Sequence, residues 1–99
     1  MDERKELLCG RRLLFNPGQV VITRNARDKV PPMDVQNGFQ RHTQGDWGDL
    51  VEEDRLSNEQ ALVDDGQLVS VYQATTGQRF WIITASDRSV TIILLPEDC

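Results

Sequence analysis

His42 is the only histidine of the 99 residues, so any relay that needs an imidazole depends on this one residue. A Ser-His-Asp or Cys-His arrangement would use it as a general base. Two acids, Asp46 and Asp49, follow it closely in the sequence. A histidine near a helix end with carboxylate neighbours is more often a surface residue than a catalytic one. We therefore predict that the protein has no catalytic residue and is not an enzyme.

Metal and phosphate chemistry are also disfavoured by residue type and spacing. One histidine and two distant cysteines, Cys9 and Cys99, cannot supply the nitrogen and sulfur ligands that zinc prefers. The acids between Asp46 and Asp54 lack the alternating spacing and the central glycine of a calcium-binding EF-hand loop. The two glycines of 45–48 lie among acids and no lysine follows them, which is unfavourable for a phosphate loop. We predict no metal and no cofactor.

The clearest functional signal is an acidic block between Asp46 and Asp65, which holds eight acids and one base, Arg55. Placed mostly on one helix, these carboxylates would project a negative field over a compact patch, although acids at a helix start also have a local role in the helix dipole. Such a patch fits a basic surface on another protein, including one that normally holds nucleic-acid phosphates. The predicted partner-binding residues are Asp46, Trp47, Asp49, Glu52, Glu53, Asp54 and Glu59.

The rest of the charge is distributed unevenly along the chain. The net charge is −5, but residues 1–41 are net basic and residues 42–99 are strongly acidic. An acidic protein of this kind is not expected to bind nucleic acid directly. The basic side chains could meet the acidic helix of a second copy, or the two regions could face each other within one chain. Those basic side chains are Arg11, Arg12, Arg24, Arg27 and Lys29.

The sequence thus favours a small acidic, non-catalytic protein-binding module, and two alternatives stay open. One is a self-associating structural or regulatory dimer. The other is a small RNA-cleaving toxin, in which Arg79 and Arg88 would hold RNA on a sheet and His42 would act as the base. With only two cations on the predicted sheet, RNA cleavage is the less favoured of these alternatives.

The elements that position these residues form one small α+β domain spanning residues 1–99, in which residues 1–14 can be flexible. No apolar stretch reaches the length of about 18 residues needed to cross a bilayer. The mixed charges of residues 1–6 do not resemble the basic start of a secretory signal. We expect a cytoplasmic protein that makes no membrane contact and keeps its thiols reduced.

Three apolar runs separated by turn residues predict an antiparallel three-stranded meander over Leu68–Gln73, Gln78–Thr84 and Ser89–Leu95. The run Val20–Thr23 is a candidate fourth, edge strand. Both faces of this sheet are apolar, so we expect helices to cover one face and a loop or a second subunit to cover the other.

Shorter patterns predict the helices. Residues 3–15 are compatible with an amphipathic helix interrupted at Gly10. Thr23 or Asn25 would cap a helical turn over 26–29, and Pro32 would open a helix of about two turns on which Met33, Val35, Phe39 and His42 share one side. Residues 44–50 predict a structured bend with Trp47 as an aromatic plug. Asp49 would cap a helix that ends near Asp65, with Gly66 as its left-handed stop. Its inner face would use Val51 and Leu62, with Leu56 or Ala61.

Seven short segments of the sequence form a recognisable pattern: Gly45–Leu50, Glu53-Asp54, Asn58-Glu59, Ala61-Leu62, Trp81–Thr84, Asp87–Ser89 and Leu94–Pro96. Together they resemble a group of small bacterial proteins carried on plasmids and genomic islands, for which no activity is established. The resemblance covers roughly residues 15–99, and departs from the group at Pro31-Pro32 and before Leu14. It implies a mobile-element context, where inhibitors and regulators of host defence are common.

Overall fold

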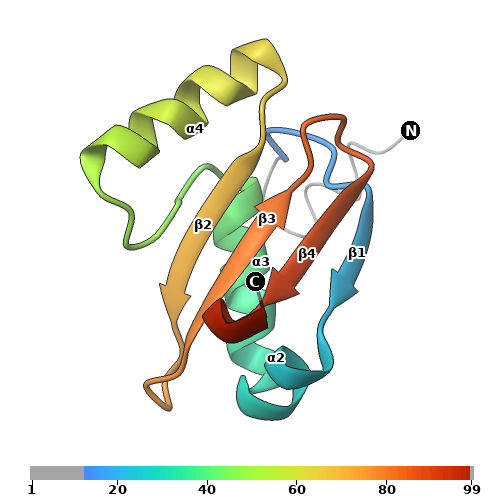
Figure 1. The fold of residues 1–99 in the computed structure, drawn as a ribbon, viewed down its shortest axis with the longest axis vertical. Helices are drawn as coiled ribbons and strands as arrows, with labels where there is room; N and C mark the ends of the chain where they lie inside the picture. The colour runs from blue at the N-terminus through green and yellow to red at the C-terminus, as the bar shows by residue number, and fades with distance from the viewer. Residues whose placement is uncertain (1–12, 99) are drawn as a thin grey trace.

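The computed structural model describes residues 13–98 and shows an α+β fold of three helices packed on a four-stranded sheet (Figure 1). Part of the predicted helix over 3–15 therefore lies outside the described residues, as do Cys9 and Cys99. In chain order the elements are β1 (Gln19–Ile22), α2 (Arg24–Lys29), α3 (Pro32–Thr43), α4 (Glu52–Asp64), β2 (Leu68–Gln73), β3 (Arg79–Thr84), β4 (Val90–Leu94) and the 3-10 turn η1 (Pro96–Asp98).

The sheet has the strand order β1-β4-β3-β2. Strands β2, β3 and β4 form the predicted antiparallel meander, and β1 is the additional edge strand, parallel to β4. The turn between β2 and β3 places Gly77 at φ +95°, as expected for a glycine there. The turn between β3 and β4 instead uses Arg88, at φ +61°. The sheet therefore mixes parallel and antiparallel pairs. Two parallel strands need a long connection between them, and the chain from β1 to the meander supplies it with α2, α3 and α4.

Helix α3 covers one face of the sheet, and the main hydrophobic core lies between them (Figure 1). Alternate residues of β2 and β3 point into this core, as the period of two along a strand requires. Gly38 of α3 allows the close approach, since a Cβ there would lie 2.9 Å from the Phe80 ring. The buried core residues are Ala26, Val30, Tyr72, Ala74, Phe80, Ile82, Ile93 and Leu95.

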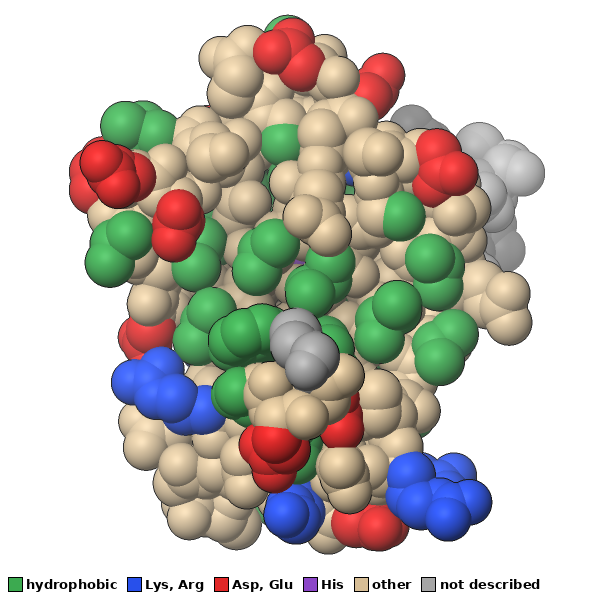
Figure 2. All heavy atoms as spheres, in the orientation of Figure 1, with side chains coloured by type: hydrophobic (Ala, Val, Ile, Leu, Met, Phe, Trp, Pro, Cys, Tyr) green, Lys and Arg blue, Asp and Glu red, His purple; other side chains and the backbone are tan. Residues whose placement is uncertain are grey.

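The opposite face of the sheet, which we name the open face, points toward the viewer in Figures 1 and 2. Its residues alternate with the core residues along the strands, and their hydrophobic side chains form a continuous patch (Figure 2). Most of them are half-buried, whereas Val21 is 40% exposed and Leu94 is only 8% exposed. Helices α2 and α3 lie on the other face, and the short turn η1 lies in front of one end of the sheet (Figure 1). Residues 13–98 therefore provide the helical cover expected for one face, but neither a long loop nor a second subunit over the other. The open face comprises Val21, Val69, Val71, Trp81, Ile83, Val90, Ile92 and Leu94.

The first two helices begin as their sequences predict. The Thr23 hydroxyl accepts a hydrogen bond from the Ala26 amide at 3.1 Å and so caps α2. Pro32 opens α3. Val35 and Phe39 point toward the sheet, but Met33 is 69% exposed, so its predicted place on the same side as Val35 and Phe39 was wrong. Residues two positions apart lie about 200° apart around a helix, which puts Met33 on the opposite side from Val35.

The acidic helix α4 differs from its prediction at both ends. Val51, and not Asp49, is its N-cap residue, because the Asp49 amide donates to the Val71 carbonyl at 2.8 Å and the chain is still paired with β2 there. At the other end Asp65, and not Gly66, has the left-handed conformation, with φ +58°. Aspartate tolerates this conformation because its short polar side chain bonds locally.

The inner side of α4 was also partly wrong. Ala61 is buried and Leu62 is partly buried, but Val51 and Leu56 are exposed. Asn58 takes the inner position instead: its side chain donates to the Val69 carbonyl at 2.6 Å and accepts from the Val69 amide at 3.1 Å. These two bonds fix the rotation of α4 against the edge of β2, because the amide and carbonyl of Val69 need hydrogen-bond partners and only this orientation of α4 brings Asn58 to them.

We expect Asn58→Leu to lower the free energy of unfolding by about 2–4 kcal/mol, because it leaves both backbone groups of Val69 without their partner. Chemical denaturation checks this value. The control is Ser57→Ala on the exposed neighbouring residue, which should change stability by less than about 0.5 kcal/mol. A loss in Asn58→Leu no larger than in this control would contradict the anchoring role.

Candidate functional site

A groove of about 620 Å³ runs between α4 and the sheet. Asp54, Ala61 and Asp64 are spaced so that they share the side of α4 that lines it. Leu50 precedes the helix, and Val69 belongs to the open face, so the apolar part of the groove continues onto the sheet. The apolar side chains Leu50, Ala61 and Val69, which we call the apolar floor, thus lie beside two carboxylates from one helix. The remaining side chains of the groove are polar (Ser57, Asn58, Gln60 and Gln67), and Gln60 donates to the Asp64 carboxylate at 2.7 Å. The groove is the candidate site that best fits the acidic block.

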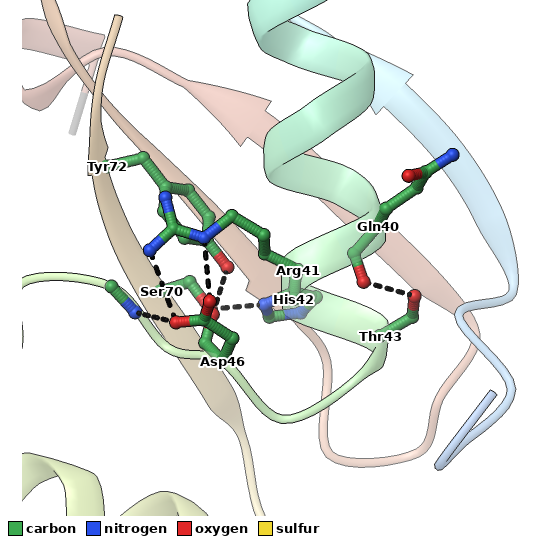
Figure 3. Close-up of polar contacts among 8 residues, drawn as sticks. Gln40, Arg41, His42, Thr43, Asp46, Ser70 and Tyr72 are labelled. Carbon is green, nitrogen blue, oxygen red and sulfur yellow. Dashed lines mark hydrogen bonds and ion pairs between the residues drawn. The ribbon is translucent and has the colours of Figure 1, made fainter. Parts of the chain in front are cut away.

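Asp46, at the start of the block, is held by a basic side chain of the same chain (Figure 3). The Arg41 guanidinium donates to its carboxylate at 2.8 and 3.2 Å and lies 4.7 Å from the centre of the Tyr72 ring. The hydrogen bond from Arg41 lowers the pKa of Asp46 below its ordinary value. The Tyr72 hydroxyl donates to the Asp46 carbonyl at 2.6 Å. These contacts fix the bend, and they neutralise one predicted contact residue.

Two further acids of the predicted set have arginine partners. Glu52 pairs with Arg55 at 2.6 Å within α4, and Asp49 lies 3.7 Å from Arg79 of β3. The hydrogen bond from Arg55 lowers the pKa of Glu52. Both pairs are solvent-exposed, so each stabilises the fold only weakly. Their carboxylates are nevertheless less available to an outside cation than the sequence alone indicates.

Trp47 and Glu59 are bound to each other. Trp47 is 3% exposed, and its indole nitrogen donates to the Glu59 carboxylate at 2.9 Å. With Leu68 and Ala61 it forms a second buried cluster beneath α4, as the aromatic plug predicted from the bend. This burial leaves Trp47 little surface to offer a partner, and its role is to hold α4 in place.

Of the predicted set, Glu53 and Asp54 are exposed and have no ion-pair partner among residues 13–98. Only Asp54 lines the groove. Asp64 also lines it, and this acid belongs to the acidic block but not to the predicted partner-binding residues. The apolar groove residues Leu50 and Val69 were not predicted from the sequence. The one sequence feature that could have indicated an apolar surface here is the apolar character of both faces of the predicted sheet.

His42 belongs to a buried chain of side-chain hydrogen bonds that runs across β2, β3 and β4, and Figure 3 shows its contact with Ser70. Its Nδ1 is 2.5 Å from the Ser70 hydroxyl, and its Nε2 is 2.9 Å from the Thr84 hydroxyl. Thr84 in turn lies 2.7 Å from Thr91, whose hydroxyl donates to the Pro17 carbonyl. Burial, with a smaller effect from the positive charge of Arg88, lowers the pKa of His42 to about 4. The imidazole is therefore neutral at pH 7.

This geometry does not assemble the RNA-cleaving arrangement considered from the sequence. His42 has no exposed surface. Arg88 donates to the carbonyls of Gly66 and Ala61, at 2.5 and 2.9 Å, and so joins the end of α4 to the β3–β4 turn. Arg79 lies at the opposite end of β3 from Thr84, about 17 Å along the strand, and on the other face. The three side chains share no surface.

Within residues 13–98, no three histidine, cysteine, aspartate or glutamate side chains come together as potential metal ligands. Over the same range, no helix has the length and apolar character needed to cross a membrane. Comparisons of the chain with protein-family models, with curated proteins and with solved structures found no match. The resemblance to proteins of mobile elements therefore stays a prediction.

Proposed function

We propose that this protein is a non-catalytic binding module for a protein with a basic surface. The observation that supports this most strongly is the groove between α4 and the sheet, in which Asp54 and Asp64 border an apolar floor. Protein interfaces commonly combine an apolar centre with a charged rim. In Figure 2 acidic side chains lie at the edge of the hydrophobic patch, which is consistent with that arrangement.

The chemistry of the groove defines the partner more closely. A basic segment with apolar side chains on one side would place lysine or arginine near Asp54 and Asp64, and its apolar groups against Leu50 and Val69. Basic segments of this kind are common on proteins that bind nucleic acid. Occupying such a segment would exclude nucleic acid from it. We therefore propose inhibition or regulation of a nucleic-acid-processing or defence enzyme by electrostatic and steric occlusion.

Two synthetic helical peptides of equal positive charge test this proposal. One places lysine and leucine at amphipathic spacing, and the other replaces each leucine by serine. We expect the lysine–leucine peptide to bind and the lysine–serine peptide to bind at least about tenfold more weakly, because only the first can use the apolar floor. Calorimetric titration at low and moderate salt measures both affinities.

Asp54→Lys should weaken binding of the lysine–leucine peptide about tenfold at low salt, because it replaces attraction by repulsion at the groove. The matched control is Asp28→Lys on α2, which changes the net charge equally and lies outside the groove. It should change the affinity by less than about twofold, since charges farther apart than the Debye length are screened. Equal weakening by both variants, or equal binding of both peptides, would disprove the proposed site.

A further inference from the structure

The two edge strands of the sheet, β2 and β1, differ in whether their outward backbone groups have hydrogen-bond partners. At the β2 edge, Asn58 bonds both backbone groups of Val69. Next along that edge, the Val71 amide donates to the Trp47 carbonyl at 3.1 Å and the Val71 carbonyl accepts from the Asp49 amide. The chain thus covers its own β2 edge with a side chain and an extended segment. Edge strands protected in this way cannot pair with another chain.

The β1 edge has no such cover among residues 13–98. The amides of Gln19 and Thr23 donate to the β4 side, to Ser89 and Ile93. Because backbone groups alternate in direction along a strand, those of Val20 and Ile22 point away from β4. No group of the described part of the chain bonds them. Figure 1 shows β1 as the outermost strand of the sheet on that side.

The composition of β1 offers no protection either. The strand Gln19–Ile22 carries no charge and no proline, the two devices that most often prevent edge pairing. Val20 is 47% exposed and Val21 is 40% exposed. Beside the strand, on the α3 side, lies a groove of about 300 Å³, lined by Val20, Ile22, Val35, Phe39 and Ile93, with Arg27 and Gln36 as polar members.

We propose that β1 pairs with β1 of a second copy, antiparallel about a two-fold axis through Val21, to form a continuous sheet across a dimer. In this register Val20 of each copy faces the partner's Ile22, and each such pair exchanges two hydrogen bonds. The outward backbone groups of both strands are then satisfied.

The side chains support the same register. Val20 and Ile22 lie on the α3 side, so each copy would place them beside the partner's apolar groove and the two grooves would meet across the axis. Arg24, the first charge after β1, would face the partner's Gly18, so no like charges oppose each other along the strand. A second copy is preferred to an unrelated extended peptide because the strand and its groove are complementary to themselves.

The experiment measures the mass of the 99-residue chain by sedimentation equilibrium from low to high micromolar concentration. We expect a monomer–dimer equilibrium. Val20→Pro removes an amide that points away from β4, so the β1–β4 bonds remain, and it should raise the dissociation constant of the dimer at least about tenfold. Val20→Thr keeps that amide and the branched side chain, and should change the constant less than threefold. Circular dichroism shows whether each variant is folded.

Amide hydrogen exchange of the unmodified protein tests the proposal without any substitution. The amides of Val20 and Ile22 should become protected as the concentration rises, whereas those of Gln19 and Thr23 should be protected at every concentration. A monomer at all concentrations would overturn the proposal. So would protection of Val20 and Ile22 that is independent of concentration, or a dimer that Val20→Pro leaves unchanged, which would place the contact on the open face.

The dimer and the proposed function can be tested independently of each other. Asp54→Lys leaves β1 untouched, and Val20→Pro leaves the groove beside α4 untouched. Loss of peptide binding without loss of the dimer, or the reverse, would therefore distinguish the two proposals.

Discussion

Gly48→Ala should lower the free energy of unfolding by about 3 kcal/mol or more, the largest effect that we expect from a single methyl group. Gly48 has φ +77°, and it forms a bridge with Val71. A Cβ at this position would lie 1.9 Å from the Val71 carbonyl oxygen and 2.8 Å from the Tyr72 ring. The variant must therefore open the contact between residues 47–49 and β2, which also holds Trp47 and the start of α4. Urea denaturation measures the loss.

Gly77→Ala is the matched control, because Gly77 also has a positive φ, at +95°, but no heavy atom lies within 4 Å of the added Cβ. Only the backbone strain of about 1–2 kcal/mol should remain. The difference between the two variants isolates the close approach to Val71. Equal losses in both would mean that the left-handed conformation, and not the contact, accounts for the requirement for glycine.

The protein should lose about 3 kcal/mol of stability as the pH falls from 6.5 to 4, a window set by His42. Burial lowers the folded-state pKa of this imidazole to about 4, from 6.5 for an unperturbed histidine. Between these values the unfolded chain binds a proton that the folded chain does not, so acid favours unfolding. Above pH 6.5 both states are neutral and the contribution is complete; below pH 4 no further loss comes from this residue. Denaturation midpoints across this pH range measure the slope.

His42→Gln provides the control, since a glutamine side chain has both a donor and an acceptor for Ser70 and Thr84 but does not titrate. This variant should be less stable at pH 7 and nearly independent of pH between 6.5 and 4.5. Asp46, Asp87 and Asp98 have lowered pKa values, so their stabilisation is lost only as the pH falls below about 4.5. A slope between 6.5 and 4.5 that persists in His42→Gln would show that another group is responsible.

The elements of this fold were largely predictable from the sequence because their signals are local. The branched and aromatic runs of the meander predicted β2 without error and β3 and β4 to within one residue at each end. Thr23 as a cap and Trp47 as a buried plug also followed from neighbouring residues. Errors occurred where a long-range contact overrode a local preference. Asp49, a good helix cap by type, is paired with Val71 instead.

The candidate site was predictable only in part. Most of the acidic block lies on α4, the helix that borders the groove, and net charge along a chain needs no coordinates. Which acids remain available depends on arginines brought in by the fold. Arg41 reaches Asp46 across the turn that ends α3, and Arg79 approaches Asp49 from β3. The sequence separation of neither pair distinguishes it from the many other combinations of an acid and an arginine in this chain.

By itself, the sequence determined the strands of the meander, the uneven charge and the presence of apolar residues on both faces of the meander, since these depend on residue type and order. Only the tertiary structure decided which face of the sheet α3 covers and that His42 is buried. It also decided that Asn58 and residues 47–49 bond the β2 edge, whereas the β1 edge has no such cover in residues 13–98. The physical reason is that hydrogen-bond satisfaction and packing are properties of pairs of groups. Their partners are distant in sequence, and no single position specifies them.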